Sequence, residues 1–450
     1  MMIFTTLEFF LFFLVFFTIY WAVASQHLMR MGFLTLGSFT FYAAWDYRFL
    51  ALLMLAIMVT FIGSKYGRHA QWLRVGCITI LLGLLGFFKY FDFFAFELAR
   101  LFSLTGLFQD SLFLNVVLPV GISFYIFQGI SQIMDAARDP SSDQPNLLET
   151  AAYLSFFPQL VAGPIVRAHE LMPYLRQPFM PDPNQLGWAG QLIIMGLIKK
   201  LIIANYLATQ IVDPIWAAGP NGALEAWLAS IAYAAQIFCD FSGYSDLAVG
   251  FSLLLGIKLP QNFNAPYGRS SFQDFWKGWH ITLSRWIRDY LYIPLGGNRL
   301  GEARRALNLL ITMGLAGLWH GANWTFMIWG LAHGLLLVAT RNIRLGVVPV
   351  FLVVTILWVP FRAPDVHAAL QFLSMLVGPM DNMPGPPIHV IILMLWGLVL
   401  AITPQDFAPG RVARFLGRTP MISAMLVVVT IWVIFALAPP GVAPFIYFQF

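Results

Sequence analysis

The sequence has few charged residues. Only 10% of its 450 residues are Asp, Glu, Lys or Arg, whereas 59% are hydrophobic. A soluble domain carries about 25% charged residues, so this composition excludes a soluble globular protein. Many windows of roughly 17–25 residues are nearly free of charge, which is long enough to cross the hydrocarbon core of a bilayer. Because these apolar runs are continuous rather than alternating, they predict transmembrane helices.

Cysteine is almost absent as well. Cys77 and Cys239 both lie in or beside apolar segments, which argues against a disulfide framework and against a cysteine metal site. There is no HExxH motif, P-loop, Rossmann glycine motif or GxSxG elbow. We therefore predict no metal and no bound cofactor, and an ATP-driven pump is disfavoured. The net charge of +5 comes mostly from basic loops, and it gives no case for nucleic-acid binding.

These patterns predict an all-α, polytopic transmembrane protein with roughly 11–13 spans and additional short re-entrant or interfacial helices. The first apolar run, 9–24, is predicted to be a retained span rather than a signal peptide, because no basic segment precedes it. Residues 186–206, 224–238 and 241–256 are predicted as three separate spans.

The orientation follows from the lysines and arginines of short loops. The loop 63–73 contains Lys65 and Arg68, and the segment from Arg269 to Arg305 contains seven basic residues. By the positive-inside rule, both segments face the cytoplasm and the N-terminus faces outward.

Three polar segments join apolar ones, namely 155–167, 239–250 and 259–267. Irregular backbone near a membrane survives only where protein or a watery cavity surrounds it. Together the segments predict a central polar tunnel. The second contains Asp240, Ser242, Tyr244 and Asp246, which form either a cavity network or a buried polar clasp between helices, and the asparagines of the third, Asn262 and Asn264, are open to the same two interpretations.

The segment 272–340 contains the strongest candidate site. It begins with a run of aromatic and charged residues and ends in an apolar region interrupted by Trp319-His320-Gly321-Ala322-Asn323. An ionisable residue at bilayer depth is a functional-site hypothesis by default. The alternative for His320 is a core histidine bonded to a backbone carbonyl.

Other polar residues of this segment have two interpretations each. His280 either orients His320 or holds a substrate carbonyl, or else it is an interfacial residue that helps to end a helix. On a helix Asn323 would share a face with His320 and could donate to a developing oxyanion; alternatively it closes a buried break in the backbone. His333 is predicted to form a hydrogen bond between helices.

The segments FWKGWHITLSRWIRDYLYIPLGGN (275–298) and GLWHGANWTFMIWGLAHG (317–334) resemble the signature of the membrane-bound O-acyltransferases. The segments 118–135, 155–167, 239–250, 259–267 and the C-terminal PFIYFQF (444–450) resemble the bacterial, alginate O-acetyltransferase-like branch of that family. One departure is Gly278, which stands where the family usually has a second basic residue.

The resemblance implies one integral membrane domain over 1–450, with N-terminal helices 1–117, the family core 118–340, and C-terminal helices with an aromatic tail 341–450. It implies that two funnels meet at His320, which takes a proton from an acceptor hydroxyl attacking an acyl thioester. A buried imidazole stays neutral and basic at pH 7. Lys277, Arg285 and Arg288 would then contact phosphates of the acyl donor, either acetyl-CoA as co-substrate or an acyl carrier protein. Snorkelling at the cytoplasmic interface explains these three residues as well.

Tyr447 is the fourth residue from the end of the sequence, within the aromatic tail. The resemblance implies that it carries the acyl group, since a phenol is a better leaving group than an alkyl hydroxyl. The alternative is an aromatic-belt anchor in the lipid bilayer.

The sequence thus predicts an inner-membrane O-acyltransferase, and most specifically an O-acetyltransferase acting on an exported bacterial polysaccharide such as alginate. The resemblance also implies a periplasmic SGNH-type acetyltransferase partner and polysaccharide machinery. Two alternatives stay open. One is D-alanyl transfer from a carrier protein to a cell-envelope polymer; the other is a transporter of a glycan or acyl carrier, although no pair of matching halves with broken helices is visible.

Overall fold

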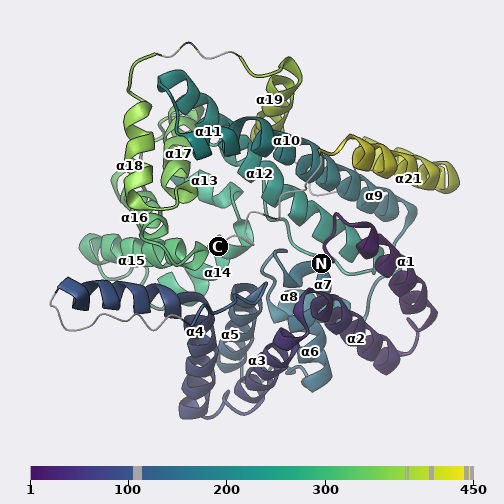
Figure 1. Cartoon of the computed structure of the whole chain (residues 1–450). Coiled ribbons are helices and arrows are strands. Elements are labelled where there is room, and N and C mark those ends of the chain that lie inside the picture. Colours follow the sequence, from purple (N-terminus) through teal and green to yellow (C-terminus); the bar gives the residue numbers. More distant parts are fainter. Residues whose placement is uncertain are drawn as a thin grey trace. The chain divides into compact units, whose positions relative to one another are not determined.

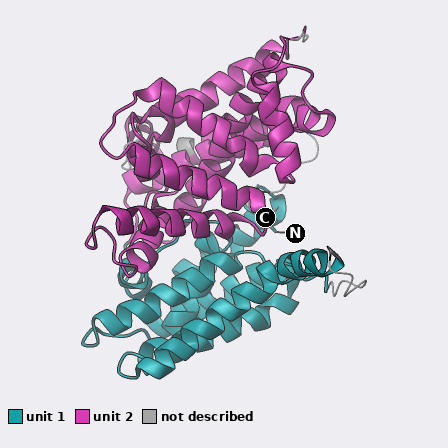
Figure 2. Cartoon of the chain, turned by 90° about the vertical axis from the view of Figure 1, so that its left-hand side faces the viewer, with its two compact units in different colours: residues 1–179 teal, residues 180–450 magenta. Residues whose placement is uncertain are grey.

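The computed structural model describes residues 2–104, 114–380, 382, 385–404, 410–439 and 445. Within these residues the chain forms helices and no strands, which confirms the predicted fold class (Figure 1). It divides into two compact units, Met1–Phe179 and Met180–Phe450 (Figure 2). The single-domain organisation expected from the sequence stays a prediction.

Unit 1 contains α1 (Leu7–Ala22), α2 (His27–Asp46), α3 (Arg48–Lys65), α4 (Gln71–Leu104), α5 (Ile122–Arg138), α6 (Leu147–Ser155), α7 (Phe157–Leu160) and α8 (Ala168–Arg176). Helix α5 is buried along most of its length and packs against α3 and α4. Its polar side chains bond across helices: Gln132 Nε2 donates to Ser64 Oγ and Thr150 Oγ1, both at 3.1 Å. Such bonds hold helices together where lipid gives no hydrophobic driving force.

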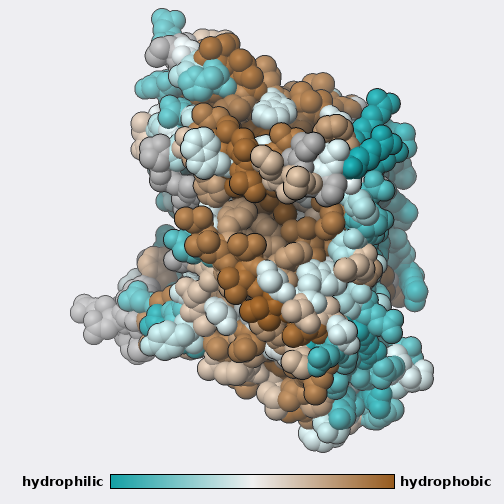
Figure 3. Space-filling model, turned by 90° about the vertical axis from the view of Figure 1, so that its right-hand side faces the viewer, coloured by the Kyte–Doolittle hydropathy of each residue, from teal (hydrophilic) through white to brown (hydrophobic). Residues whose placement is uncertain are grey.

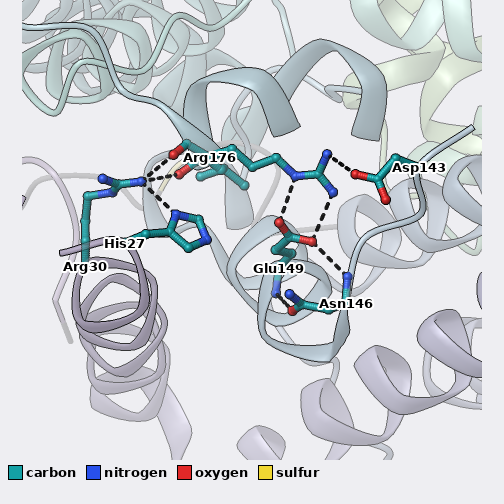
Figure 4. A network of polar contacts seen from close by, with 7 residues as sticks. His27, Arg30, Asp143, Asn146, Glu149 and Arg176 are labelled. Atoms are coloured by element: carbon teal, nitrogen blue, oxygen red, sulfur yellow. Dashed lines mark hydrogen bonds and ion pairs between the residues drawn. The ribbon is translucent and has the colours of Figure 1, made fainter. Parts of the chain in front are cut away.

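A network of hydrogen bonds and ion pairs joins the start of α2, the loop before α6 and the end of α8 (Figure 4). Arg176 binds Glu149 at 2.7 Å and Asp143 at 2.8 Å, while Arg30 donates to the carbonyl oxygen of Arg176 at 2.6 Å. Arg68, in the loop after α3, donates to the carbonyl oxygen of Pro140 at 3.2 Å. These contacts bring the loop after α3, the loop before α6 and the end of α8 together near the start of α2.

The described residues of unit 2 form three π-helical segments, η1, η2 and η4, and one 3₁₀ turn, η3. Its elements are α9 (Pro183–Leu197), η1 (Ile198–Ala204), α10 (Asn205–Leu207), η2 (Ala208–Val212), α11 (Asp213–Ala218), α12 (Ala223–Leu254), η3 (Pro266–Gly268), α13 (Phe272–Gly278), α14 (Ile281–Ile287), η4 (Arg288–Tyr292), α15 (Glu302–His320), α16 (Trp324–Ala339), α17 (Val347–Arg362), α18 (Val366–Met375), α19 (Ile388–Ile402), α20 (Arg411–Arg418) and α21 (Pro420–Leu437). π-helical turns are frequent at functional sites, so these segments indicate that unit 2 contains such a site.

Helix α12 corrects one prediction. The segment 239–250 does not separate two spans; it lies inside a single helix of 32 residues. Its glycines serve close packing: a Cβ added at Gly243 would lie 2.9 Å from the carbonyl oxygen of Gly196, and one at Gly196 would lie 2.7 Å from that of Gly243. Glycine thus lets the backbones of α9 and α12 approach, as small residues do in membrane helix pairs.

Three helical stretches are long and apolar enough to cross a bilayer, Arg48–Lys65, Gln71–Ser103 and Pro183–Ala218, and six shorter apolar helices accompany them in the described residues. Large hydrophobic side chains such as Leu14, Val429 and Trp432 are exposed. Figure 3 shows a face on which hydrophobic side chains predominate and hydrophilic ones gather along one margin. The chain is thus a multi-pass membrane protein, and the number of crossings expected from the sequence stays a prediction.

Candidate active site

Both candidate histidines lie in the interior of unit 2. His320 is the last residue of α15 and is 3% exposed, and His280 lies between α13 and α14 and is fully buried. Burial lowers the pKa of the His280 imidazole, so this ring is neutral at pH 7. A neutral imidazole is the form that accepts a proton.

The indole of Trp319 contacts both imidazoles. Its ring centroid lies 5.9 Å from that of His280 and 5.0 Å from that of His320. The rings of Trp329 and Phe361 complete the surroundings of His320, each with its centroid at 5.1 Å. These aromatic rings keep bulk water away from the imidazole of His320. The catalytic roles of the two histidines stay predictions.

A cavity of about 320 Å³ lies beside the His280 segment. Its polar lining comprises Gln191, Lys199, Ser245, Asp246, Gln261 and Asn262. Asn262 connects the cavity to the imidazole, because its Oδ1 lies 3.2 Å from His280 Nδ1. The polar segments 239–250 and 259–267 therefore do line a cavity, as the sequence predicts, although the first of them is helical.

Two consecutive lysines pair with two aspartates of α12. Lys199 Nζ lies 2.7 Å from Asp246 Oδ2, and Lys200 forms a second ion pair with Asp240. Both lysines belong to the π-helical segment η1, whose wider turns allow neighbouring side chains to reach the same partner helix. All four side chains are at most 15% exposed. The clasp interpretation of Asp240 therefore agrees with the structure, and Asp246 both pairs and lines the cavity.

The Lys199–Asp246 pair yields a stability prediction. Lys199→Met should lower the melting temperature of the purified protein, because Asp246 would keep a buried charge without its partner, at a cost of about 3–5 kcal/mol. The double variant K199M/D246L should recover most of that loss. Lys258→Met, at an exposed lysine, is the matched control. Equal melting temperatures for the wild type and K199M would show that the pair does not stabilise the fold.

Phe445 lies in the same region of unit 2. The ring of Phe445 stacks on that of Tyr244 with centroids 4.7 Å apart, and it lies 5.7 Å from the ring of Phe241. Phe241 in turn contacts His280, with centroids 4.6 Å apart. Tyr447, the predicted acyl carrier, lies outside the described residues.

Asn323 does not share a helix with His320, which corrects that prediction. Helix α15 ends at His320, and Asn323 is the N-cap of α16, where its Oδ1 accepts from the Thr325 N–H at 3.0 Å and its Nδ2 donates to the Pro364 carbonyl oxygen at 2.6 Å. These contacts close the break between the two helices. A role of Asn323 toward an oxyanion stays a prediction.

The three basic residues expected to contact the acyl donor are Lys277 in α13, Arg285 in α14 and Arg288 in η4. Lys277 is exposed and binds Asp274 at 2.8 Å, and Arg288 is exposed and binds Asp289 at 2.7 Å. Neither these two nor Arg285 belongs to the lining of the cavity described above. Their contact with a donor stays a prediction.

The structure also shows the surroundings of His333 and Gly278. Neither ring nitrogen of His333 has a hydrogen-bond partner in the described part of the chain, so the predicted bond between helices is wrong. Its ring packs instead against those of Trp276 and Trp329, at 5.1 and 4.9 Å. At Gly278 an added Cβ would lie 2.6 Å from the Asn264 carbonyl oxygen, so glycine permits two segments of the site to approach closely.

Comparison with known proteins places this arrangement in a family. The model of the membrane-bound O-acyltransferase family matches residues 132–359. The chain is 35% identical to the probable alginate O-acetylase AlgI of Pseudomonas putida, over 98% of each chain, and 36% identical to the peptidoglycan O-acetyltransferase of Helicobacter pylori, over 79% of this chain and 75% of that one. It is 31% identical to the teichoic acid D-alanyltransferase of Bacillus subtilis, over 50% of this chain and 59% of that one. The chain belongs to the membrane-bound O-acyltransferase family and is an O-acyltransferase.

Proposed function

We propose that this protein is a bacterial inner-membrane O-acetyltransferase that moves acetyl groups from cytoplasmic acetyl-CoA toward an exported cell-surface polysaccharide. The observation that carries the proposal is the pair of buried imidazoles on Trp319, one of them joined to a polar cavity through Asn262. Relatives named as alginate and peptidoglycan O-acetylating enzymes support the acetyl group and a polysaccharide acceptor.

His320 acts as the general base. Its imidazole takes the proton of an acceptor hydroxyl as that oxygen attacks the thioester carbonyl, forming a C–O bond. The C–S bond then breaks, and the leaving thiolate takes the proton back from the imidazolium. A positioned base contributes roughly 10²–10⁴-fold to such a step. The enclosure by Trp319, Trp329 and Phe361 favours it, because excluding water protects the thioester from hydrolysis.

The acyl donor enters through the cavity lined by Lys199, Asp246 and Asn262. Gly410, which also lines it, directly precedes α20, a helix that carries Arg411, Arg414 and Arg418. By the positive-inside rule these arginines lie toward the cytoplasm, the side on which acetyl-CoA is available. Lys277, Arg285 and Arg288, which lie outside the cavity lining, are further cationic groups that attract the phosphates of the donor.

Tyr447 receives the acetyl group before it passes to the polymer. Phe445, two residues earlier in the chain, lies on Tyr244 and Phe241, and Phe241 contacts His280. A phenol of pKa about 10 forms an ester reactive enough to pass its acyl group onward. A periplasmic SGNH-type acetyltransferase and the polysaccharide machinery are the partners that complete the transfer.

D-alanyl transfer is the second candidate, supported by the similarity to the teichoic acid D-alanyltransferase. Comparing exported glycans of cells with and without the protein by mass spectrometry tests both. We expect the loss of O-acetyl esters from one exported polysaccharide in cells without the protein. Loss of D-alanyl esters would support the second candidate instead, and unchanged ester content of both kinds would contradict the proposed function.

A further inference from the structure

One asparagine holds the turn that contains His280. Asn262 is 3% exposed, and its Oδ1 lies 2.9 Å from Thr282 Oγ1, 3.3 Å from the Thr282 nitrogen and 3.2 Å from His280 Nδ1. Its Nδ2 donates to Ser245 Oγ at 3.3 Å. The amide thus connects α12, on the cavity wall, with the start of α14.

The same asparagine holds the backbone of the turn. The carbonyl oxygen of Asn262 accepts from the Ile281 N–H at 2.9 Å. His280 has a φ of 42°, in the left-handed region, which is unfavourable for a residue with a side chain. The bonds that Asn262 accepts from the two residues after His280, Ile281 and Thr282, keep it in that conformation.

These contacts determine which nitrogen of His280 carries the proton. A backbone N–H can only donate, so the amide atom that faces Thr282 is the oxygen. An amide oxygen can only accept, so His280 Nδ1 must carry a hydrogen to bond with it at 3.2 Å. In the neutral ring the lone pair is therefore on Nε2.

We propose that Asn262 is a positioning residue that fixes His280 as a hydrogen-bond acceptor through Nε2 during acyl transfer. This inference rests on the proposed function and decides between two roles of His280. A neutral ring whose Nδ1–H is bound by Asn262 has no hydrogen left to hold a thioester carbonyl. Through Nε2 the neutral His280 ring can only accept a hydrogen bond, so the role of holding the carbonyl is excluded and the role of orienting the groups around His320 remains.

The groups around His280 set the pH dependence. The elements packed around it include these charged and titratable groups: Asp240 and Asp246 of α12, each paired with a lysine, Tyr244 of α12, His320 of α15, and Lys277 and Arg285 of its own segment. Each of the two aspartates is neutralised by its own lysine. A new negative charge at residue 262 would therefore be the main change in the electrostatic potential at the imidazole.

The experiment measures kcat/KM for acetyl-CoA against pH, with the purified full-length protein in lipid nanodiscs. In Asn262→Asp the carboxylate stabilises the imidazolium, so the acid limb of the profile should move upward by about 1–3 pH units. In Asn262→Ala the tautomer is no longer fixed, and kcat should fall by roughly 100-fold with KM unchanged. Asn264→Asp, in the same loop, is the matched control and should move the acid limb less, because Asn264 Oδ1 has no hydrogen-bond partner among the described residues.

The outcomes separate this inference from the proposed function. An Asn262→Asp profile that matches the wild type, or an equal shift in Asn264→Asp, would overturn the role of Asn262 while the wild-type activity still supports the enzyme. A wild-type protein that never consumes acetyl-CoA would instead overturn the proposed function. The yield and melting temperature of each variant show whether it folds. If one of the two Asn262 variants does not fold, the other still tests the proposal.

Discussion

His320→Ala should abolish transfer of acetyl groups from acetyl-CoA while the protein still inserts and accumulates normally. The variant removes the imidazole that takes the proton of the attacking hydroxyl, and such a base contributes roughly 10²–10⁴-fold. Because His320 is the last residue of α15 and lies among aromatic rings, alanine leaves a cavity but no unpaired charge. The measurement is the release of coenzyme A by purified protein, together with its yield from membranes.

The matched control is His367→Ala, which removes an exposed imidazole of α18 and should leave the rate unchanged. His320→Gln gives a second comparison, since its amide fills much of the same space but cannot act as a base at neutral pH. Normal acetyl transfer in either His320 variant would exclude His320 as the base. A loss of rate that goes with a loss of folded protein in both would point to a packing role instead.

The class of the fold follows directly from the sequence, because continuous apolar runs leave helices as the way to satisfy the backbone in lipid. The boundaries of α12 do not follow in the same way. Its segment 239–250 contains two aspartates and two glycines, which favour a break in the absence of partners. The partners come from η1 and α9: lysines neutralise the aspartates, and the small residues allow close packing. A local pattern cannot show either effect.

Part of the candidate site could also be predicted from the sequence. Trp319-His320 stands out as an imidazole in an apolar region, and both candidate histidines are buried. The lysines of η1 gave a signal that could have been used, because Lys199 and Lys200 interrupt an apolar run and a buried charge requires a partner. Their pairing with Asp246 and Asp240 depends on the packing of two helices. The contact of Asn262 with His280 joins residues 18 apart through a left-handed turn, which spacing does not reveal.

Two sets of contacts meet at the imidazole of His280. On one side, the cavity reaches His280 through Asn262. On another, Phe445 reaches it through Phe241. The proposed transfer from a cytoplasmic donor to an outer acceptor requires a point that both reactants reach. The position of Phe445 is therefore the reason to test the C-terminal tail as a participant rather than as an anchor.

Tyr447→Phe should remove the acetyl ester that forms on the protein and should prevent acetylation of the exported polymer, since phenylalanine keeps the ring but has no oxygen to esterify. Purified wild-type protein incubated with labelled acetyl-CoA should yield a C-terminal peptide with label on Tyr447, and His320→Ala should yield none. Tyr66→Phe, at an exposed tyrosine, is the control for loss of a phenol elsewhere. Polymer that is acetylated normally in Tyr447→Phe would rule out the tyrosine relay and leave direct transfer from acetyl-CoA. An aromatic-belt anchor predicts that same result, because phenylalanine anchors a chain in the interface nearly as well as tyrosine does; the single hydroxyl therefore separates the two interpretations of the tail.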